Sequence, residues 1–184
     1  MNAADQGVRE PGKQRYQAIP RTLIFVTSID PATGARDVLL IKGAPAKRLW
    51  AARYNGLGGH VEAGEDVRQA AVRELAEETG LHLPKLALRG VVNIDTGADE
   101  QGPRPGVLVF VFHGETDQRA VAATAEGTPE WLPISALRNY PRVDDLDDLI
   151  PRVLAHGPLF FGHYALRTDG ALAYRFDEGP ADDG

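Results

Sequence analysis

Residues 59–81 read GHVEAGEDVRQAAVRELAEETGL, and this stretch determines most of what the sequence predicts. Glu74, Glu77 and Glu78 are spaced i, i+3 and i+4, so a helix would place their side chains on one side. Like charges at that spacing repel and destabilise a bare helix. A hard divalent cation removes the repulsion, and Mg²⁺ is the usual cation of oxygen-only clusters. The stretch therefore predicts a short helix, ended by Gly80, that binds Mg²⁺, with Mn²⁺ as a substitute.

The helix phase predicts that these carboxylates lie on the face that packs inward. At about 100° per residue, Glu74 and Glu78 fall within roughly 60° of Val67 and two alanines. Carboxylates on an inward face are costly unless they are paired, protonated or bound to metal. The alternative is a solvated helix whose glutamates pair with Arg68 and Arg73. That arrangement would turn the valine and both alanines outward, so metal binding is favoured.

The same stretch resembles the signature of the Nudix hydrolases, G-x5-E-x7-R-E-U-x-E-E-x-G-U, where U is an aliphatic residue. Every fixed position is filled, by Gly59, Glu65, Arg73, Glu74, Leu75, Glu77, Glu78, Gly80 and Leu81. In that family the loop–helix–loop binds divalent metal and cleaves a nucleoside diphosphate linked to another group. The resemblance therefore implies a metal-dependent hydrolase.

The resemblance also implies a role for each motif residue. The implied metal ligands are Glu74, Glu77, Glu78 and the backbone carbonyl of Gly59. Glu65 corresponds to the residue that pairs with Arg73 and can contact a further metal. The general base is left open among Glu65, Glu77, Glu78 and Glu126.

Residues 54–59 (YNGLGG) are rich in glycine directly before the motif. They resemble the W-N-G-x-G-G segment of MutT-type Nudix enzymes, which clear oxidised purine nucleoside triphosphates, with Tyr54 in place of the tryptophan. The resemblance implies that Asn55 contacts the purine, and Gly58 would let a substrate approach the backbone closely. The alternative is that the Asn-Gly pair only forms a turn.

Four basic residues precede the motif, namely Lys42, Lys47, Arg48 and Arg53. Such a cluster can hold phosphate oxygens, or it can belong to a solvated loop. Lys42 is the best candidate for substrate binding, because it follows a strand directed toward the expected site.

Residues 126–131 (EGTPEW) resemble the MutT-type segment that carries an extra glutamate before a tryptophan. That glutamate serves as a metal ligand or base, and Glu126 matches it by position. Glu130 and Glu115 are alternatives, and a surface glutamate in a turn is an equal interpretation.

Four aspartates begin a second predicted helix, namely Asp144, Asp145, Asp147 and Asp148. Some relatives that act on oxidised purines place aspartates here against the base, which makes Asp145 a candidate for substrate binding. Aspartates at a helix start are usually caps and dipole partners, and we favour that interpretation.

Composition excludes several classes of protein. The net charge of −6 argues against a surface that binds a nucleic acid polymer. The chain has no cysteine, so disulfides and thiolate sites are excluded. The sequence contains neither an apolar run of membrane-spanning length nor a signal-peptide hydrophobic region, so we expect no membrane association and a cytoplasmic protein. The expected partner is a small nucleotide, bound by a monomer or a homodimer.

Strand patterns alternate with two helical patterns along one domain of residues 19–176, between flexible tails at 1–18 and 177–184. We expect strands at 22–29, 38–41, 57–61, 86–95 and 107–113, a short extended segment at 131–133, and a final hairpin of 159–166 with 171–176. A loop is expected at 96–106, and Pro151 should kink the second helix or mark a restart. This order predicts an α/β fold, a mixed sheet in an α/β/α sandwich, and the Nudix resemblance implies the same.

The leading functional hypothesis is Mg²⁺-dependent hydrolysis of a nucleoside triphosphate, 8-oxo-dGTP or a related purine, to the monophosphate and pyrophosphate. Hydrolysis of ADP-ribose, a dinucleoside polyphosphate or another nucleotide-linked diphosphate is the enzymatic alternative. A non-catalytic nucleotide-binding module is disfavoured, because such Nudix-fold proteins typically lack motif glutamates and none is missing here.

Overall fold

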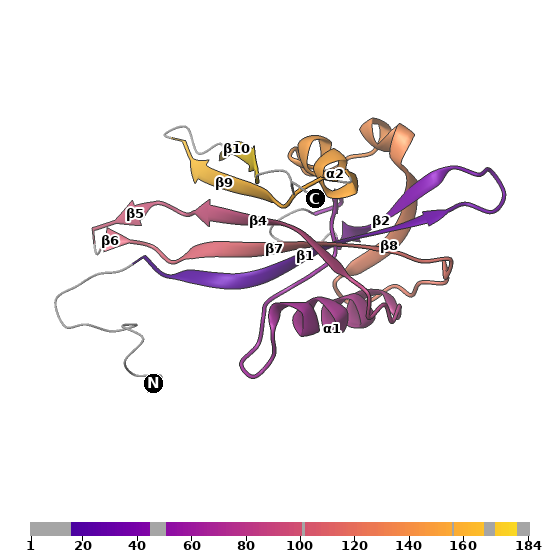
Figure 1. Cartoon of the computed structure of the whole chain (residues 1–184), viewed down its shortest axis with the longest axis horizontal. Helices are drawn as coiled ribbons and strands as arrows, with labels where there is room; N and C mark the ends of the chain where they lie inside the picture. The colour runs from indigo at the N-terminus through magenta and orange to yellow at the C-terminus, as the bar shows by residue number, and fades with distance from the viewer. Residues whose placement is uncertain (1–15, 45–50, 101, 156, 168–171, 180–184) are drawn as a thin grey trace.

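The computed structural model describes residues 16–44, 51–100, 102–155, 157–167 and 172–179 (Figure 1). Most of the expected N-terminal tail, the last five residues, and the basic residues Lys47 and Arg48 lie outside the described residues. Two α-helices are described, α1 (Val67–Thr79) and α2 (Leu146–Leu154). The main strands are β1 (Ala18–Ile29), β2 (Arg36–Gly43), β3 (Tyr54–Asn55), β4 (Ala87–Asp95), β7 (Gly106–Glu115), β8 (Gly127–Pro133), β9 (Phe160–Leu166) and β10 (Leu172–Glu178).

These strands form one mixed eight-stranded sheet in the order β10-β9-β4-β7-β1-β2-β3, with β8 paired to β2. The pairs β1–β7 and β4–β9 are parallel, and the other pairs are antiparallel. Helix α1 lies on one side of the sheet and α2 on the other (Figure 1). The predicted mixed sheet with helices on both sides is therefore confirmed.

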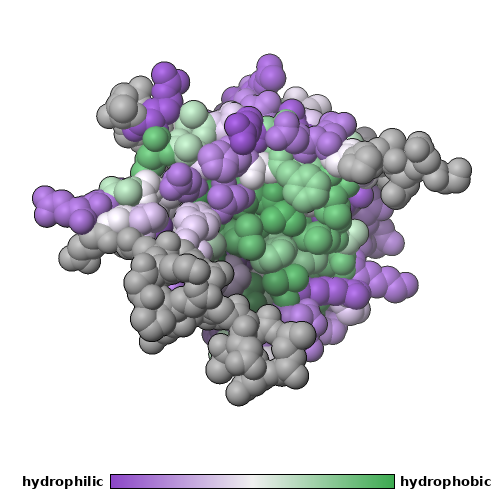
Figure 2. All heavy atoms as spheres, turned by 60° about the vertical axis from the view of Figure 1, so that its left-hand side comes forward, coloured by the Kyte–Doolittle hydropathy of each residue, from purple (hydrophilic) through white to green (hydrophobic). Residues whose placement is uncertain are grey.

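The sheet is buried on both faces where the helices cover it. Along β1, Phe25 packs in the cluster that contains the core residues of α2, whereas Ile24 and Val26 pack in the cluster that contains Leu75 of α1. Successive strand residues point to opposite faces, so a continuous apolar run can serve both layers. Figure 2 turns the left-hand side of Figure 1 toward the viewer. It shows that hydrophobic side chains form a patch on this surface.

Local sequence signals set both ends of α1. The side chain of Asp66 accepts hydrogen bonds from the backbone N–H groups of Arg68 and Gln69, and the Gln69 side chain accepts from the Asp66 N–H. This capping box satisfies donors that the first turn of a helix leaves unpaired. At the other end Gly80 adopts φ 77° and donates its N–H to Ala76, as expected for a glycine cap.

Several predicted boundaries were wrong. Residues 57–61 are not a strand: Leu57 and His60 make single bridges to β1, and the short strand is β3 instead. The expected loop at 96–106 contains the two-stranded pair β5 (Ala98–Asp99) and β6 (Gly102–Pro103). β8 begins at Gly127, well before the predicted segment, and β10 continues to Glu178.

Pro151 lies inside α2 and does not end it. A proline there removes one backbone hydrogen bond from the helix. The apolar stripe of α2, which includes Leu149, Ile150 and Val153, is buried, and this packing offsets the loss. A 3₁₀ helix (Ile134–Asn139), absent from the sequence prediction, precedes α2. Among the described helices, neither the length nor the apolar character needed to cross a membrane is found.

Gly90 lies where β4 and β9 approach each other closely. These strands pair Gly90 directly with Phe160, and a Cβ at Gly90 would lie 2.3 Å from the Phe160 ring. Because Phe160 is only 2% exposed, its ring has little room to move. We expect Gly90→Ala to lower the free energy of unfolding by about 1–3 kcal/mol in urea denaturation.

Gly157→Ala is the matched control, because no described atom lies within 4 Å of a Cβ there. We expect it to change stability by at most about 0.5 kcal/mol. Equal effects of the two substitutions would contradict the close packing of Phe160 over Gly90.

Candidate active site

Arg73 of α1 bonds to four other residues around it. Its Nε and Nη2 donate to the two carboxylate oxygens of Glu65 at 3.1 and 2.7 Å. Its Nη1 donates to Glu74 at 2.9 Å and to Glu77 at 3.1 Å, and Nη2 also donates to the His60 carbonyl at 3.0 Å. The Glu65 bond is the main cause that raises the pKa of Arg73, and the same bond lowers the pKa of Glu65. The predicted Glu65–Arg73 pair is therefore present, within a larger network.

The backbone of Gly58 and Gly59 lies directly against the glutamates of α1. The Gly58 N–H donates to Glu78 Oε2 at 2.8 Å, and a Cβ on Gly59 would lie 2.4 Å from Glu74 Oε1. Gly58 has φ 128°, and a Cβ there would lie 2.4 Å from the Thr22 carbonyl oxygen. Only glycine fits at Gly58, because this position combines positive φ with a close approach to backbone, whereas a side chain at Gly59 would have to displace the Glu74 carboxylate.

The ligand set fits a hard divalent cation in its chemistry. Glu74, Glu77 and Glu78 offer only carboxylate oxygens. The Gly59 backbone lies against Glu74, and its carbonyl accepts from the Thr22 N–H at 2.9 Å. Glu78 is 5% exposed, and a buried carboxylate needs neutralisation. Within the described ranges no three His, Cys, Asp or Glu side chains are already grouped as a metal site. Since Arg73 bonds both Glu74 and Glu77, metal binding would require these side chains to rearrange.

The other candidate acids belong to β7, to β8 and to the turn before β8. Glu126 is exposed in the turn before β8, where its carbonyl accepts from Ala44 at 3.4 Å. The two alternatives have other partners, since Glu130 accepts from the Tyr54 hydroxyl at 2.8 Å and Glu115 pairs with Arg36.

Lys42 and Asn55 lie on paired strands β2 and β3. The Lys42 ammonium is 5.5 Å from the centroid of the Tyr54 ring. Asn55 Oδ1 accepts from the Gly56 N–H at 2.8 Å, which is a turn-like local bond. Asn55 pairs with Ile41 of β2 and is three residues before Gly58, so it adjoins the glutamate cluster along the chain.

The structure brings the segment before α2 against β3. The Tyr54 N–H donates to the Pro141 carbonyl at 2.8 Å, and the Val143 N–H donates to the Tyr54 carbonyl at 3.0 Å. Arg53 adds a bond to Asp144 at 2.6 Å. The candidates Asn55 and Asp145 therefore lie on segments that are joined by backbone hydrogen bonds, although 90 positions separate them in the sequence.

The favoured interpretation of Asp145 as a helix cap was wrong. Asp145 occupies the N-cap position of α2, but its side chain makes no capping bond and accepts instead from the Tyr164 hydroxyl at 2.8 Å. The dipole interpretation holds for Asp147 and Asp148, which lie in the first turn. The sequence analysis did not identify Tyr164. An aromatic residue in a strand is usually a core residue, and the sequence does not reveal which group its hydroxyl bonds.

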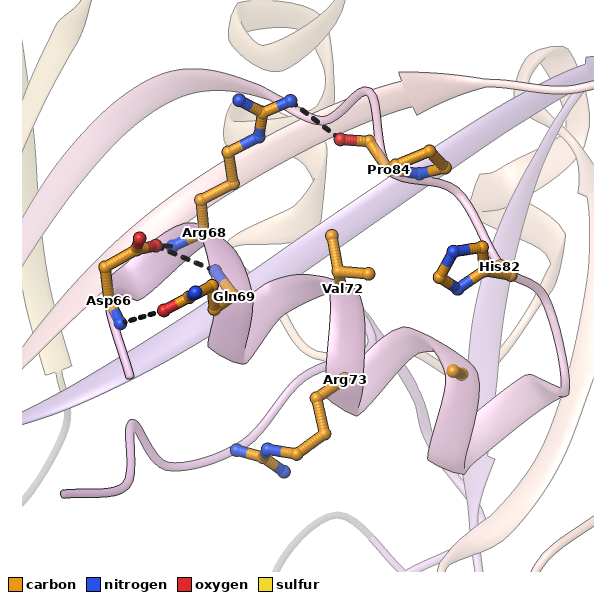
Figure 3. A pocket seen from close by; sticks show the side chains of 8 residues that line it. Asp66, Arg68, Gln69, Val72, Arg73, His82 and Pro84 are labelled. Carbon is orange, nitrogen blue, oxygen red and sulfur yellow. Dashed lines mark hydrogen bonds between the residues drawn. The ribbon is translucent and has the colours of Figure 1, made fainter. Parts of the chain in front are cut away.

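A cavity of about 460 Å³ opens beside α1 (Figure 3), and none of the three glutamates lines it. Its lining residues are Asp66, Arg68, Gln69, Val72, Arg73, Ala76, His82 and Pro84. It meets the glutamate network only through Arg73, so it is not the expected substrate site.

Comparison with known proteins identifies the family. The family model described as NUDIX domain matches residues 20–153, most of the chain, so the chain belongs to the Nudix hydrolase family. The uncharacterized Nudix hydrolase YvcI of Bacillus subtilis is 27% identical over 143 residues, 77% of this chain and 87% of that protein. An oxidized purine nucleoside triphosphate hydrolase of Danio rerio is 30% identical over 98 residues, 53% of this chain and 60% of that protein.

The fold agrees with a solved structure. The crystal structure of a mutator MutT protein from Bacillus halodurans matches with a TM-score of 0.70 and 24% identity, over 88% of this chain and 99% of that chain. The expected Nudix α/β/α architecture is therefore confirmed.

Arg73→Ala should lower both stability and activity. It leaves Glu65 and Glu74, whose side chains are 16% and 15% exposed, without their guanidinium partner. We expect a loss of about 3 kcal/mol, the low end for a broken buried pair, because 26% of the Arg73 side chain is exposed. Urea unfolding and initial hydrolysis rates measure the two effects.

Arg68→Ala is the control on the same helix, because Arg68 is exposed and its guanidinium bonds the Pro84 carbonyl, outside the glutamate network. We expect a change within about 0.5 kcal/mol and normal activity. Wild-type stability and activity in Arg73→Ala would show that the network is dispensable.

Proposed function

We propose that this Nudix hydrolase uses Mg²⁺ to cleave a purine nucleoside triphosphate to the monophosphate and pyrophosphate, with 8-oxo-dGTP as the leading substrate. The observation that carries the proposal is that the Gly58–Gly59 backbone, which begins three residues after Asn55, lies against Glu74 and Glu78 of α1, the helix that also carries Glu77. The Danio rerio relative, named for oxidized purine triphosphates, supports this substrate class.

The proposed metal ligands are Glu74, Glu77, Glu78 and the Gly59 carbonyl, with Glu126 as a further candidate. When bound, Mg²⁺ would neutralise charge on phosphoryl oxygens and make water more acidic. Mn²⁺ has the same preference for oxygen ligands and should substitute.

The protein supplies positioned carboxylates for proton transfer. A water oxygen bonds to the β-phosphorus, the bond from that phosphorus to the α–β bridging oxygen breaks, and this oxygen leaves with the monophosphate. A nearby carboxylate takes the water proton. Both oxygens of Glu65 accept from Arg73, which lowers the pKa of Glu65 and makes it a poor base. The proton acceptor is therefore Glu77, Glu78 or Glu126.

The proposed substrate contacts come from β2 and β3, from the loop before α1 and from the start of α2. Asn55 uses its side-chain oxygen for Gly56, so we assign recognition of the purine to its amide N–H groups. Asp145 would accept from N–H groups of the base. Lys42 would leave the Tyr54 ring to meet phosphate oxygens, and Gly58 would allow close approach of the substrate.

A nucleotide panel with Mg²⁺ tests the proposal. The wild-type protein should release pyrophosphate from 8-oxo-dGTP and dGTP faster than from dCTP. ADP-ribose and a dinucleoside tetraphosphate belong in the same panel. Faster turnover of either one than of every triphosphate would replace the proposed substrate class with the alternative.

Glu77→Gln or Glu78→Gln should remove most of kcat, because a carboxamide keeps the size but loses the charge that binds a hard cation. Activity of the wild type should also disappear with EDTA and return with Mg²⁺ or Mn²⁺. Glu62→Gln is the control, since Glu62 is exposed in the same loop and occupies a variable position of the motif. Wild-type turnover by both motif variants at the normal Mg²⁺ concentration would refute the metal assignment.

Asn55→Ala should raise KM for the preferred purine triphosphate more than it lowers kcat, because the base lies away from the β-phosphorus. One hydrogen bond to a neutral base is worth about 0.5–1.5 kcal/mol, or about two- to tenfold in KM. The effect should be smaller on dCTP.

Asn55→Asp tests base recognition while it preserves the hydrogen bond that stabilises the turn. It keeps an oxygen for the Gly56 N–H but loses the amide donors, so it should raise KM while the melting temperature stays normal. Equal losses on 8-oxo-dGTP, dGTP and dCTP in both variants would show that Asn55 only shapes the turn.

A further inference from the structure

The four aspartates at the start of α2 differ in their partners. Three pair with arginines: Asp144 with Arg53 at 2.6 Å, Asp147 with Arg142 at 2.5 Å and Asp148 with Arg152 at 3.8 Å. Among the ion pairs of the described residues, none involves Asp145. Its carboxylate is bonded instead by a neutral group, the Tyr164 hydroxyl, at 2.8 Å.

The backbone explains why Asp145 does not cap the helix. An N-cap residue normally has extended φ and ψ, which direct its side chain back to the N–H groups of the first turn. Asp145 has φ −76° and ψ −12°, a helical conformation, and its side chain reaches the sheet instead. The bond to Tyr164 thus replaces the local bond that this position usually makes.

The side chains of Asp145 and Tyr164 are largely shielded from solvent. Tyr164 is 4% exposed and Asp145 is partly buried. Burial raises the pKa of Asp145, and the charges of Asp144 and Asp148 raise it further, while the Tyr164 bond acts in the opposite direction. The carboxyl group of Asp145 thus has a hydrogen bond from a phenol but no cationic partner within the described part of the chain. A partly buried carboxyl of this kind is well suited to accept hydrogen bonds from the N–H groups of a ligand.

The C-terminal hairpin holds the phenol in place. Tyr164 of β9 pairs directly with Tyr174 of β10, and the two ring centroids are 5.2 Å apart. The Tyr174 hydroxyl donates to Asp148 Oδ2 at 2.8 Å, which gives a second phenol–carboxylate bond one helical turn away. This hairpin lies after residue 153, where the family match ends.

Asp145 is also tied to the segment that carries Asn55. Val143, two residues earlier, donates to the carbonyl of Tyr54, the residue directly before Asn55. Asp145 therefore follows a segment that is fixed by a backbone hydrogen bond to the strand that carries Asn55.

We propose that Tyr164 is a positioning residue that fixes the carboxyl group of Asp145 for recognition of the N–H groups on the edge of a purine base. This inference rests on the proposed function. A guanine-type edge presents N–H donors, and a carboxyl whose Oδ2 is held by Tyr164 presents its other oxygen in one direction. Tyr164 itself contacts Asp145 and not the substrate.

The test compares Tyr164→Phe with Tyr174→Phe. Each variant keeps its ring and loses one hydroxyl bonded to an aspartate of α2, but Asp148 retains Arg152. Tyr164→Phe should raise KM about two- to tenfold for the preferred purine triphosphate, with less effect on kcat and on dCTP. Tyr174→Phe should leave both KM values unchanged. Equal KM changes on purine and pyrimidine, or none, would overturn the inference.

Binding of 8-oxo-dGMP and dGMP by calorimetry tests the same point without turnover. Failure of the wild type to hydrolyse purine triphosphates would refute the proposed function alone. Dissociation constants equal in wild type, Tyr164→Phe and Tyr174→Phe, or no binding to the wild type, would overturn the positioning role.

Asp145→Ala provides a second route, which stays decisive if Tyr164→Phe is unstable. It should raise KM for the purine at least as much as Tyr164→Phe, and adding Tyr164→Phe to it should cause no further change. Wild-type KM in Asp145→Ala, or additive losses in the double variant, would contradict a shared function of the two side chains.

Discussion

The candidate active site depends on one guanidinium group. Arg73 donates two hydrogen bonds to Glu65, one each to Glu74 and Glu77, and one to the His60 carbonyl. A planar fork with five donors can bond several carboxylates at once, whereas a lysine offers a single point charge. Because Glu65 and His60 belong to the loop and the other two belong to α1, Arg73 joins the loop to the helix. It also offsets the repulsion that the closely spaced glutamates would otherwise cause.

The second constraint is the close approach of backbone to carboxylates. Gly59 lies so near Glu74 that a methyl group would have to displace the Glu74 carboxylate, and Gly58 donates to the buried Glu78. Gly59 also bonds to Thr22 of β1, through both its N–H and its carbonyl, so the loop is fixed to the sheet as well as to the helix. Ligand groups held by a helix, a strand and a short loop keep their geometry better than groups on a free loop.

A different part of the fold supports the proposed base contacts. The segment before α2 is bonded to β3, and Asp145 at its end is bonded by Tyr164 of β9. β9 pairs with β4, on the other half of the sheet from β3. The proposed recognition site thus draws on strands from both halves of the sheet, whereas the glutamate cluster draws on one helix and its loop.

The sequence by itself determined the ends of α1, its glutamate face and the mixed sheet between two helices. These features follow from contacts a few residues apart and from apolar periodicity, both of which can be read directly from the chain. The Glu65–Arg73 pair was implied by the resemblance to the Nudix signature. Only the tertiary structure decided that residues 57–61 bridge to β1 without forming a strand, and that Asp145 bonds Tyr164. Such contacts depend on the order and register of strands, which local patterns do not encode, so a local rule predicted a cap for Asp145 and failed.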